Sequence, residues 1–458
     1  MSRTEAAGKT GHRGLGWATI VAAALLARLA VIVTGFGRLD DPDNYLVLAR
    51  SLAAGRGFAL DGHPTAYRPP LYPVVLAPLV AMLGGRIAWG IAGLHLLLGA
   101  GTVVLTAAAA RRWGLSPGRA LLAAAVVGCD PVLVAQGRVV MTEVLAAFLM
   151  AAALAALAEG NPRGAAWGGV WLGLGTLCRP GALPVAGLVT VAAGFVRPGP
   201  GPVRLRRAAA IAMATVATLI PWAWRNARLF GEPVWTTTHG GYTLALANNP
   251  AYYAAIVDGP PGAAWSGPDQ RRWFVAVDRA MRGLSEPEAD RRFRALGLRM
   301  VVEQPRDFAR SSLARLGRLW GVAPSGAVYP RAPRIATAIW TVPLWMALAR
   351  GLTRRTLWRW PQVGAPLVVV ALSAVHALYW TDLRMRAGGP GHRPDCRLGR
   401  NPPAGAAPER RPRGSELGTE WSQKNRKIPR ILLFKFPRNV RLKTAALGGI
   451  PLVSRLGR

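Results

Sequence analysis

The chain has 458 residues, of which 51% are apolar and 17% are charged, and its formal net charge is +35. This usage is typical of membrane proteins, because a helix that crosses a bilayer needs about 20 largely apolar residues. It excludes an ordinary soluble enzyme. The basic residues gather in segments between apolar runs, as in cytoplasmic loops, and no nucleic-acid recognition motif accompanies them. We therefore do not expect nucleic acid as a partner.

Ten apolar runs follow one another along the chain and predict membrane helices. They cover residues 14–36, 70–83, 87–110, 120–135, 144–158, 165–177, 181–195, 208–224, 335–349 and 363–380. Several are short, but their Ala and Gly content favours close helix packing. The first run follows a basic leader without a cleavage-site pattern, so it is interpreted as an anchor that starts in the cytoplasm. The second run conflicts with the count of crossings. It is either a half-helix or a sign of a misplaced loop nearby.

The runs divide the chain into four segments and predict an all-α polytopic membrane protein. Residues 1–225 are expected to form a membrane catalytic module with an outer loop at 37–69. Residues 226–333 form an extracytoplasmic segment of mixed character, with helical periodicity over 286–320. Residues 334–386 return to the membrane. Residues 387–458 are rich in Pro, Gly and Arg, which is typical of a basic, disordered tail.

The outer loop begins with three clustered carboxylates, Asp40, Asp41 and Asp43. The stretch YLVLARSLAAG that follows predicts a short interfacial helix with Tyr45 on its apolar face. Pro42 suits the first turn of this helix, and Asp41 or Asp40 can cap it. A cap accounts for one carboxylate and not for all three. Clustered carboxylates raise one another's pKa, which can make one of them a general base.

Three further charged residues stand at the edges of apolar runs. Arg68 precedes Pro69 and Pro70, where it is either an interfacial anchor or a clamp on an anionic headgroup. Arg179 separates two apolar runs and, near a bilayer, requires a partner or a function. Glu143 begins an apolar run, where a carboxylate also suits a helix start. No residue set in the sequence has metal-ligand or nucleotide-binding spacing, so no cofactor is expected, although a divalent metal requirement stays open.

Five motifs in register over about residues 15–386 resemble family 39 glycosyltransferases, the dolichyl-phosphate-mannose protein mannosyltransferase-like membrane enzymes with the GT-C fold. The first is DPDNYLVLARSLAAGRGF at 41–58 with PTAYRPPLYP at 64–73. The others are LCRP at 177–180, PWAWRN at 221–226, GGY at 240–242 with NNP at 248–250, and RLGRLW at 315–320.

The resemblance implies roles for four residues, which three others are expected to support. The catalytic Asp of the family lies four residues before the loop Tyr, which selects Asp41. Arg68 and Arg179 would bind the donor phosphate, and Glu143 would be a second acid. Asp43, Tyr45 and Tyr67 would support these groups.

The implied activity is inverting transfer of a sugar from a polyprenyl-phosphate donor to an extracytoplasmic acceptor, which is a lipid, a glycan or a protein. The protein would lie in the plasma or inner membrane with its catalytic loops outside. After residue 386 the chain departs from the family, which suggests an aberrant C-terminus. The alternatives are a transporter or flippase of lipid-linked sugars and an inactive, truncated family member.

Overall fold

The structure is a computed structural model that describes residues 3–34, 40–259, 265, 268–324 and 330–379. The tail predicted at 387–458 lies outside the described residues, as do residues 380–386 of the last membrane segment. Helix α13 (Pro268–Met281) belongs to a compact unit of its own. All other elements named below belong to the other unit, in which the candidate site lies.

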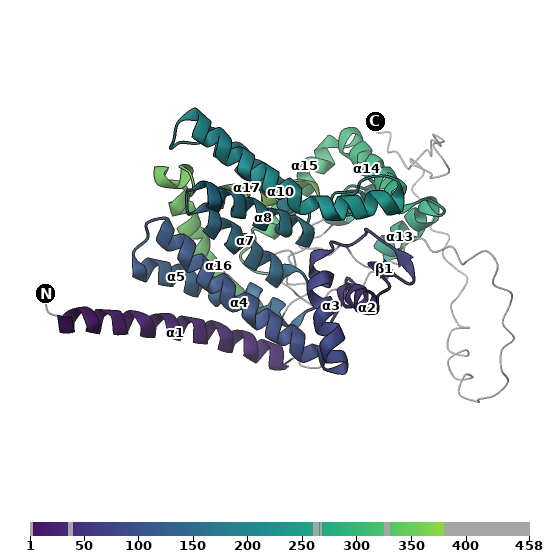
Figure 1. Cartoon of the computed structure of the whole chain (residues 1–458). Coiled ribbons are helices and arrows are strands. Elements are labelled where there is room, and N and C mark those ends of the chain that lie inside the picture. The colour runs from purple at the N-terminus through teal and green to yellow at the C-terminus, as the bar shows by residue number, and fades with distance from the viewer. Residues whose placement is uncertain (1–2, 35–39, 260–264, 266–267, 325–329, 380–458) are drawn as a thin grey trace. The chain divides into compact units, whose positions relative to one another are not determined.

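Each of the ten apolar runs contains a helix within its described residues, and the predicted all-α membrane fold is confirmed (Figure 1). The helices are α1 (Arg3–Thr34), α3 (Leu71–Leu83), α4 (Ile87–Arg112), α5 (Pro117–Gly128), α6 (Pro131–Ala135), α7 (Glu143–Leu157), α8 (Pro162–Cys178), α9 (Ala182–Phe195), α10 (Gly201–Phe230), α16 (Arg331–Leu352) and α17 (Gly364–Leu378). The strands in the described part of the chain are β1 (Ala59–Leu60) and β2 (His63–Pro64), an antiparallel pair in the outer loop.

The helices of the first half of the chain pack closely against one another. Helix α8 contacts α7 and α10, α4 contacts α5 and α7, and α9 contacts α10 and α17. Glycine permits the approach of α8 to α10, because a Cβ on Gly169 would lie 2.4 Å from the carbonyl oxygen of Ile211. Small residues at such crossings are typical of membrane helices, whose association depends on close van der Waals packing.

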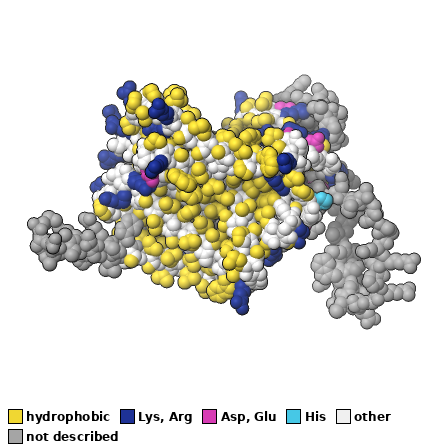
Figure 2. Space-filling view, viewed as in Figure 1, with side chains coloured by type: hydrophobic (Ala, Val, Ile, Leu, Met, Phe, Trp, Pro, Cys, Tyr) yellow, Lys and Arg dark blue, Asp and Glu magenta, His cyan; other side chains and the backbone are white. Residues whose placement is uncertain are grey.

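Among the residues that the structure describes, two helical stretches are long and apolar enough to cross a membrane, Leu71–Arg112 and Arg331–Leu352. A third candidate is the pair Pro117–Gly128 and Pro131–Arg138, which bends by 42°. The bend occurs where the Asp130 carboxylate accepts the N–H groups of Val132 and Leu133 and so starts a new helix. Apolar side chains also cover much of the surface in view in Figure 2, with Arg and Lys gathered mainly toward its margins.

The second apolar run is a helix in its own right. Helix α3 has 13 residues and is separated from α4 by a 3-10 turn at Gly84–Arg86. Gly84 adopts a positive φ of 49°, which interrupts the helical path. Helix α3 is thus the first part of the apolar stretch Leu71–Arg112, and the turn at Gly84–Arg86 separates it from α4.

The segment after α10 folds into α11 (Gly240–Ala247), α12 (Pro250–Ile256), α14 (Glu286–Glu303) and α15 (Pro305–Leu319). The helical periodicity predicted at 286–320 is confirmed, with a break at Gln304. The fully buried Arg315 donates to the carbonyl oxygens of Ala247 and Ala377, which lie in α11 and near the end of α17. Asn248 also donates to Leu378. Arg315 of the RLGRLW motif and Asn248 of the NNP motif therefore link α11 and α15 to α17 by hydrogen bonds.

Candidate active site

The acidic cluster of the outer loop begins helix α2 (Tyr45–Ala53). One oxygen of Asp41 accepts the N–H of Tyr45 at 2.8 Å, and the other accepts the N–H of Leu46 at 2.9 Å. The short helix and its capping by Asp41 are confirmed. The placement of Pro42 in the first helical turn is wrong. The helix starts three residues later because Asn44 adopts a left-handed conformation, with a φ of 62°.

A backbone contact brings this loop to the start of α7. Asp40 and Val139 form an isolated parallel bridge, in which Val140 donates its N–H to the Asp40 carbonyl at 2.9 Å. Val140 is fully buried, three residues before Glu143. Two acidic positions about 100 residues apart in the sequence thus lie on neighbouring segments.

Two ion pairs join the charged residues that the sequence singled out. Arg68 contacts the Asp43 carboxylate at 2.8 Å, and Arg179 contacts the Glu143 carboxylate at 2.8 Å. The Glu143 side chain is 8% exposed. Its second oxygen, Oε2, is buried and has no hydrogen-bond partner within the described part of the chain. Each arginine is therefore held by a carboxylate from another element.

The Tyr45 phenol lies among these charges. Burial raises its pKa, the carboxylates of Asp43 and Glu143 raise it further, and the guanidinium groups of Arg68 and Arg179 lower it. All four groups are thus close enough to Tyr45 to act on it through space. The structure brings together both ion pairs, the helix α2 and the loop that carries Asp41.

The Tyr45 ring packs against Tyr72, which is the first of a series of buried, hydrogen-bonded polar groups. It meets the Tyr72 ring edge-on at 5.6 Å. The Tyr72 hydroxyl lies 2.8 Å from His95 Nε2, and His95 Nδ1 lies 2.8 Å from the carbonyl oxygen of Gly137. Both nitrogens of His95 are therefore occupied. This histidine has a structural role, because it links α3 and α4 to the segment before α7.

The Asp41 carboxyl has an unusual electrostatic environment. Burial raises its pKa to about 6, and the negative charge of Asp43 adds to the effect. The N–H donors of α2 act in the opposite direction, because they stabilise the ionised form. A carboxyl with such a pKa is ionised at neutral pH and can still take up a proton during a reaction.

His239 and Tyr242 were not among the predicted site residues. The Tyr67 ring meets the His239 ring edge-on at 4.4 Å, and His239 lies 5.2 Å from the ring of Tyr242. The Arg68 guanidinium lies 5.3 Å from the centre of the Tyr67 ring. The sequence signal was the GGY motif, which immediately follows His239.

Glu286 was missed as well. Its Oε1 accepts the Thr65 hydroxyl at 2.6 Å, and its Oε2 accepts the Ala66 N–H at 2.8 Å and the Thr238 hydroxyl at 3.0 Å. This single carboxylate fixes the residues just before Tyr67 and just before His239. The first residue of α14 thereby holds the Pro-rich turn against the loop before α11. Thr65 and Ala66 lie 221 and 220 positions away in the sequence, and Thr238 lies 48 positions away, so no local pattern predicts them.

No group of three or more His, Cys, Asp and Glu side chains that could hold a metal ion occurs among the described residues.

Residues 80–193 match the family model of dolichyl-phosphate-mannose-protein mannosyltransferases. The resemblance to this family is confirmed. No curated protein sequence matches the chain.

The mannosyltransferase match covers the helices from the end of α3 to α9. It includes Glu143 and Arg179, whose ion pair joins the start of α7 to the end of α8. Asp41 and Arg68 precede the matched segment. The matched segment thus contributes the Glu143–Arg179 pair, and the Asp43–Arg68 pair comes from the chain before it.

Proposed function

We propose that this protein transfers a sugar from a polyprenyl-phosphate donor to an extracytoplasmic acceptor, with inversion at the anomeric carbon. The family match over residues 80–193 supports a mannosyltransferase-like enzyme. The observation that carries the proposal is the arrangement around Tyr45. The charges of two arginine–carboxylate pairs act on the pKa of this residue, and Asp41, whose own pKa is raised to about 6, accepts its backbone N–H.

Asp41 acts as the general base. A carboxylate has about four acceptor positions, and two of those of Asp41 receive N–H groups of α2. A further position can accept the proton of an acceptor hydroxyl or amine. The acceptor atom forms a bond to the anomeric carbon as its proton passes to Asp41. The bond from that carbon to the phosphate oxygen breaks, and its electron pair leaves with the polyprenyl phosphate. General base catalysis typically contributes 10²–10⁴-fold.

Arg68 and Arg179 bind the donor phosphate. A phosphate leaving group needs little protonation, so the main requirement is stabilisation of its negative charge. A guanidinium has five N–H donors in a fixed fork that matches phosphate oxygens. The carboxylates of Asp43 and Glu143 hold the two guanidinium groups in position.

Glu143 acts as the second acid of the site. One of its oxygens binds Arg179, and the buried Oε2 is available to a polar group of the substrate. An unsatisfied buried oxygen has a free-energy cost, and a donor from a ligand would remove that cost. Tyr45 and Tyr67 support the site by packing: the Tyr45 ring contacts Tyr72, and the Tyr67 ring lies beside the Arg68 guanidinium.

The catalytic loops lie outside the plasma or inner membrane, and the segment at 226–333 contributes to acceptor binding. The hydrogen bonds of Glu286 to residues of the outer loop support this, because they place that segment beside the Pro-rich turn. Lipid, glycan and protein acceptors all have hydroxyl or amine groups that fit the chemistry.

The test is sugar transfer in membranes that contain the full chain. A radiolabelled polyprenyl-phosphate sugar is supplied, and label is followed into lipid, glycan and protein fractions. Arg68→Ala and Arg179→Ala should weaken binding of polyprenyl phosphate and reduce transfer. Arg56→Ala is the matched control, because this exposed arginine belongs to the same loop. Movement of the labelled lipid across the membrane without sugar transfer would instead support a flippase.

A further inference from the structure

His95 and His239 differ in whether their ring nitrogens have hydrogen-bond partners. Both nitrogens of His95 have partners, Tyr72 and the Gly137 carbonyl. His239 Nδ1 is buried and has no hydrogen-bond partner in the described part of the chain. Buried polar atoms are rarely left without a partner, and each exception needs an explanation.

The backbone before His239 is fixed to the Pro-rich turn. Thr238 donates its N–H to the Ala66 carbonyl at 3.0 Å and its hydroxyl to Glu286 at 3.0 Å. The ring of His239 therefore has little freedom to reach another partner by movement of the preceding residue.

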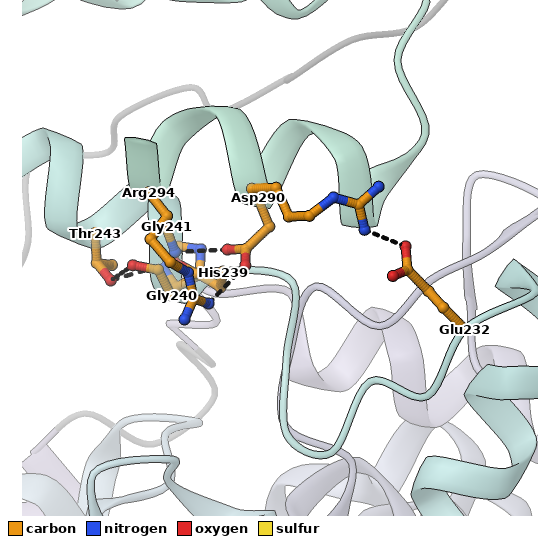
Figure 3. Close-up of polar contacts among 8 residues, drawn as sticks. Glu232, His239, Gly240, Gly241, Thr243, Asp290 and Arg294 are labelled. Carbon is orange, nitrogen blue, oxygen red and sulfur yellow. Dashed lines mark hydrogen bonds and ion pairs between the residues drawn. The ribbon is translucent and has the colours of Figure 1, made fainter. Parts of the chain in front are cut away.

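The backbone after His239 is fixed to α14 (Figure 3). Gly241 donates its N–H to the Asp290 carboxylate at 2.5 Å, and Arg294 holds the other oxygen of that carboxylate at 2.9 Å. The Thr243 hydroxyl bonds the carbonyl oxygens of His239 and Gly240. The backbone of His239 is thus held from both sides.

The surroundings of His239 favour an uncharged, ring-shaped ligand beside an anion. Tyr67 and Tyr242 place aromatic rings 4.4 and 5.2 Å from the imidazole. Burial, together with the positive charge of Arg68, lowers the pKa of His239 well below its usual value, so the imidazole is neutral at physiological pH. A neutral imidazole nitrogen can donate to or accept from a hydroxyl group, whereas it gives a phosphate no charge stabilisation. Binding sites of this kind combine aromatic walls with a few fixed polar groups.

We propose that His239 Nδ1 binds a hydroxyl group of the donor sugar, next to the phosphate that Arg68 binds. The proposal rests on the proposed function and assigns the sugar-recognition part of the same site. The aromatic rings of Tyr67 and Tyr242 contact the sugar, and His239 supplies the directional hydrogen bond. A sugar that is held in this way keeps a fixed orientation relative to its phosphate.

The experiment compares two lipids that differ only in the sugar, dolichyl-phosphate-mannose and dolichyl phosphate. Binding of each is measured with the full chain in membranes, and with His239→Phe and His239→Gln. We expect His239→Phe to weaken binding of the mannosylated lipid by roughly three- to tenfold, the equivalent of one neutral hydrogen bond. Binding of dolichyl phosphate should not change. His239→Gln should restore part of the affinity, because its amide can bond a hydroxyl.

Two controls separate this role from a structural one. His63→Phe alters an exposed histidine of β2 in the same loop and should leave both affinities unchanged. The thermal midpoint of His239→Phe should equal or exceed that of the unaltered protein, because the substitution removes an unsatisfied buried nitrogen. His95→Phe should lower the midpoint, because it leaves Tyr72 and the Gly137 carbonyl without partners.

Three outcomes would overturn the assignment. His239→Phe could bind both lipids as the unaltered protein does, could weaken both equally, or could raise only the KM of the acceptor. The proposed function would fail differently: the unaltered protein would bind neither lipid, or would bind both without transferring the sugar.

Discussion

Asp43 Oδ1 lies 2.8 Å from a terminal nitrogen of Arg68, a residue 25 positions further along the outer loop. The ion pair closes the loop between the start of α2 and the Pro-rich turn. It therefore couples the acidic cluster to the guanidinium that we assign to the donor phosphate. A change at Asp43 should act on donor binding, whereas a change at Asp41 should act on the chemical step.

Asp41→Asn should reduce sugar transfer by about 10²–10⁴-fold, because an amide cannot take up the acceptor proton. Donor affinity should be retained, and the amide oxygen still caps α2 in part. Asp43→Asn, the matched control, should retain more of kcat and weaken donor binding, because Arg68 loses its ionic partner. Initial rates and binding of polyprenyl phosphate separate the two effects. Equal and mild losses of kcat in both variants would reduce Asp41 to a helix cap.

The rate of transfer should rise with pH and reach a plateau above the pKa of Asp41, which burial raises from 3.8 to about 6. The base is protonated and inactive below that pH.

The contribution of Asp41 to folding stability should fall as pH rises, whereas the rate rises. Between pH 4 and 6 the folded state binds more protons at Asp41 than the unfolded state, so this contribution to stability falls as pH rises. Rates and unfolding midpoints of the unaltered protein and Asp41→Asn over pH 4–8 test both signs. A rate that is independent of pH over 5–7 contradicts the assignment.

The helices were predictable because lipid requires long apolar stretches, and each of the ten runs contains a helix within its described residues. The site was predictable only in part. Asp41 and Arg68 stand in a recognisable loop, but the pairing of Arg179 with Glu143 depends on how α7 and α8 meet. Glu286 stands at the start of an amphipathic stretch, where an acidic residue is ordinary for a helix. Its bonds to Thr65 and Thr238 arise only in the folded chain.

The first residue of α2 was also predicted wrongly from the sequence. Pro42 is compatible with a first helical turn, so the sequence favoured an early start. Asn44 is one of the few residue types that tolerate a left-handed conformation, and its φ of 62° moves the start to Tyr45. This conformation brings the Asp41 carboxylate to the N–H groups of Tyr45 and Leu46.

Glu143 and Arg179 should show strong energetic coupling. Glu143→Gln leaves a largely buried guanidinium without its counter-charge, and Arg179→Met leaves a carboxylate that is only 8% exposed. Each change should cost about 1–3 kcal/mol of stability, and the double variant should cost less than the sum. The Arg299–Glu303 pair on α14 is the control, because both side chains are substantially exposed and such pairs contribute about 0.3–0.5 kcal/mol. Unfolding of the four variants of each pair measures the coupling. Similar coupling in both pairs would mean that the site pair has no special role.

Glu286→Gln should loosen the Pro-rich turn. The carboxylate accepts three hydrogen bonds, from Thr65, Ala66 and Thr238, and a glutamine side chain offers one acceptor oxygen and a competing donor group. We expect a loss of about 1–3 kcal/mol and faster proteolysis near residues 59–68. Glu232→Gln is the control, since this exposed carboxylate binds one exposed arginine, Arg291. Proteolysis at an unchanged rate would show that the turn is held by other contacts.

Gly241→Ala should destabilise the contact between α11 and α14. A Cβ at position 241 would lie 2.0 Å from the Asp290 carbonyl oxygen and 2.8 Å from the Arg294 nitrogen, both of which are backbone atoms that cannot move aside alone. Forcing a methyl group into a packed contact costs about 1–3 kcal/mol, and α11 should move away from α14.

Gly240→Ala is the matched control for this change. The nearest atom to a Cβ at that position is a side-chain nitrogen of Arg294 at 3.7 Å, an ordinary contact. The thermal midpoint should fall in Gly241→Ala and stay near that of the unaltered protein in Gly240→Ala. Because Gly241 follows His239 by two residues, the displaced backbone should also carry the imidazole away from Tyr67. Gly241→Ala should therefore lose affinity for the mannosylated lipid, while Gly240→Ala keeps it. Equal tolerance of alanine at both positions would contradict the close approach of the two helices.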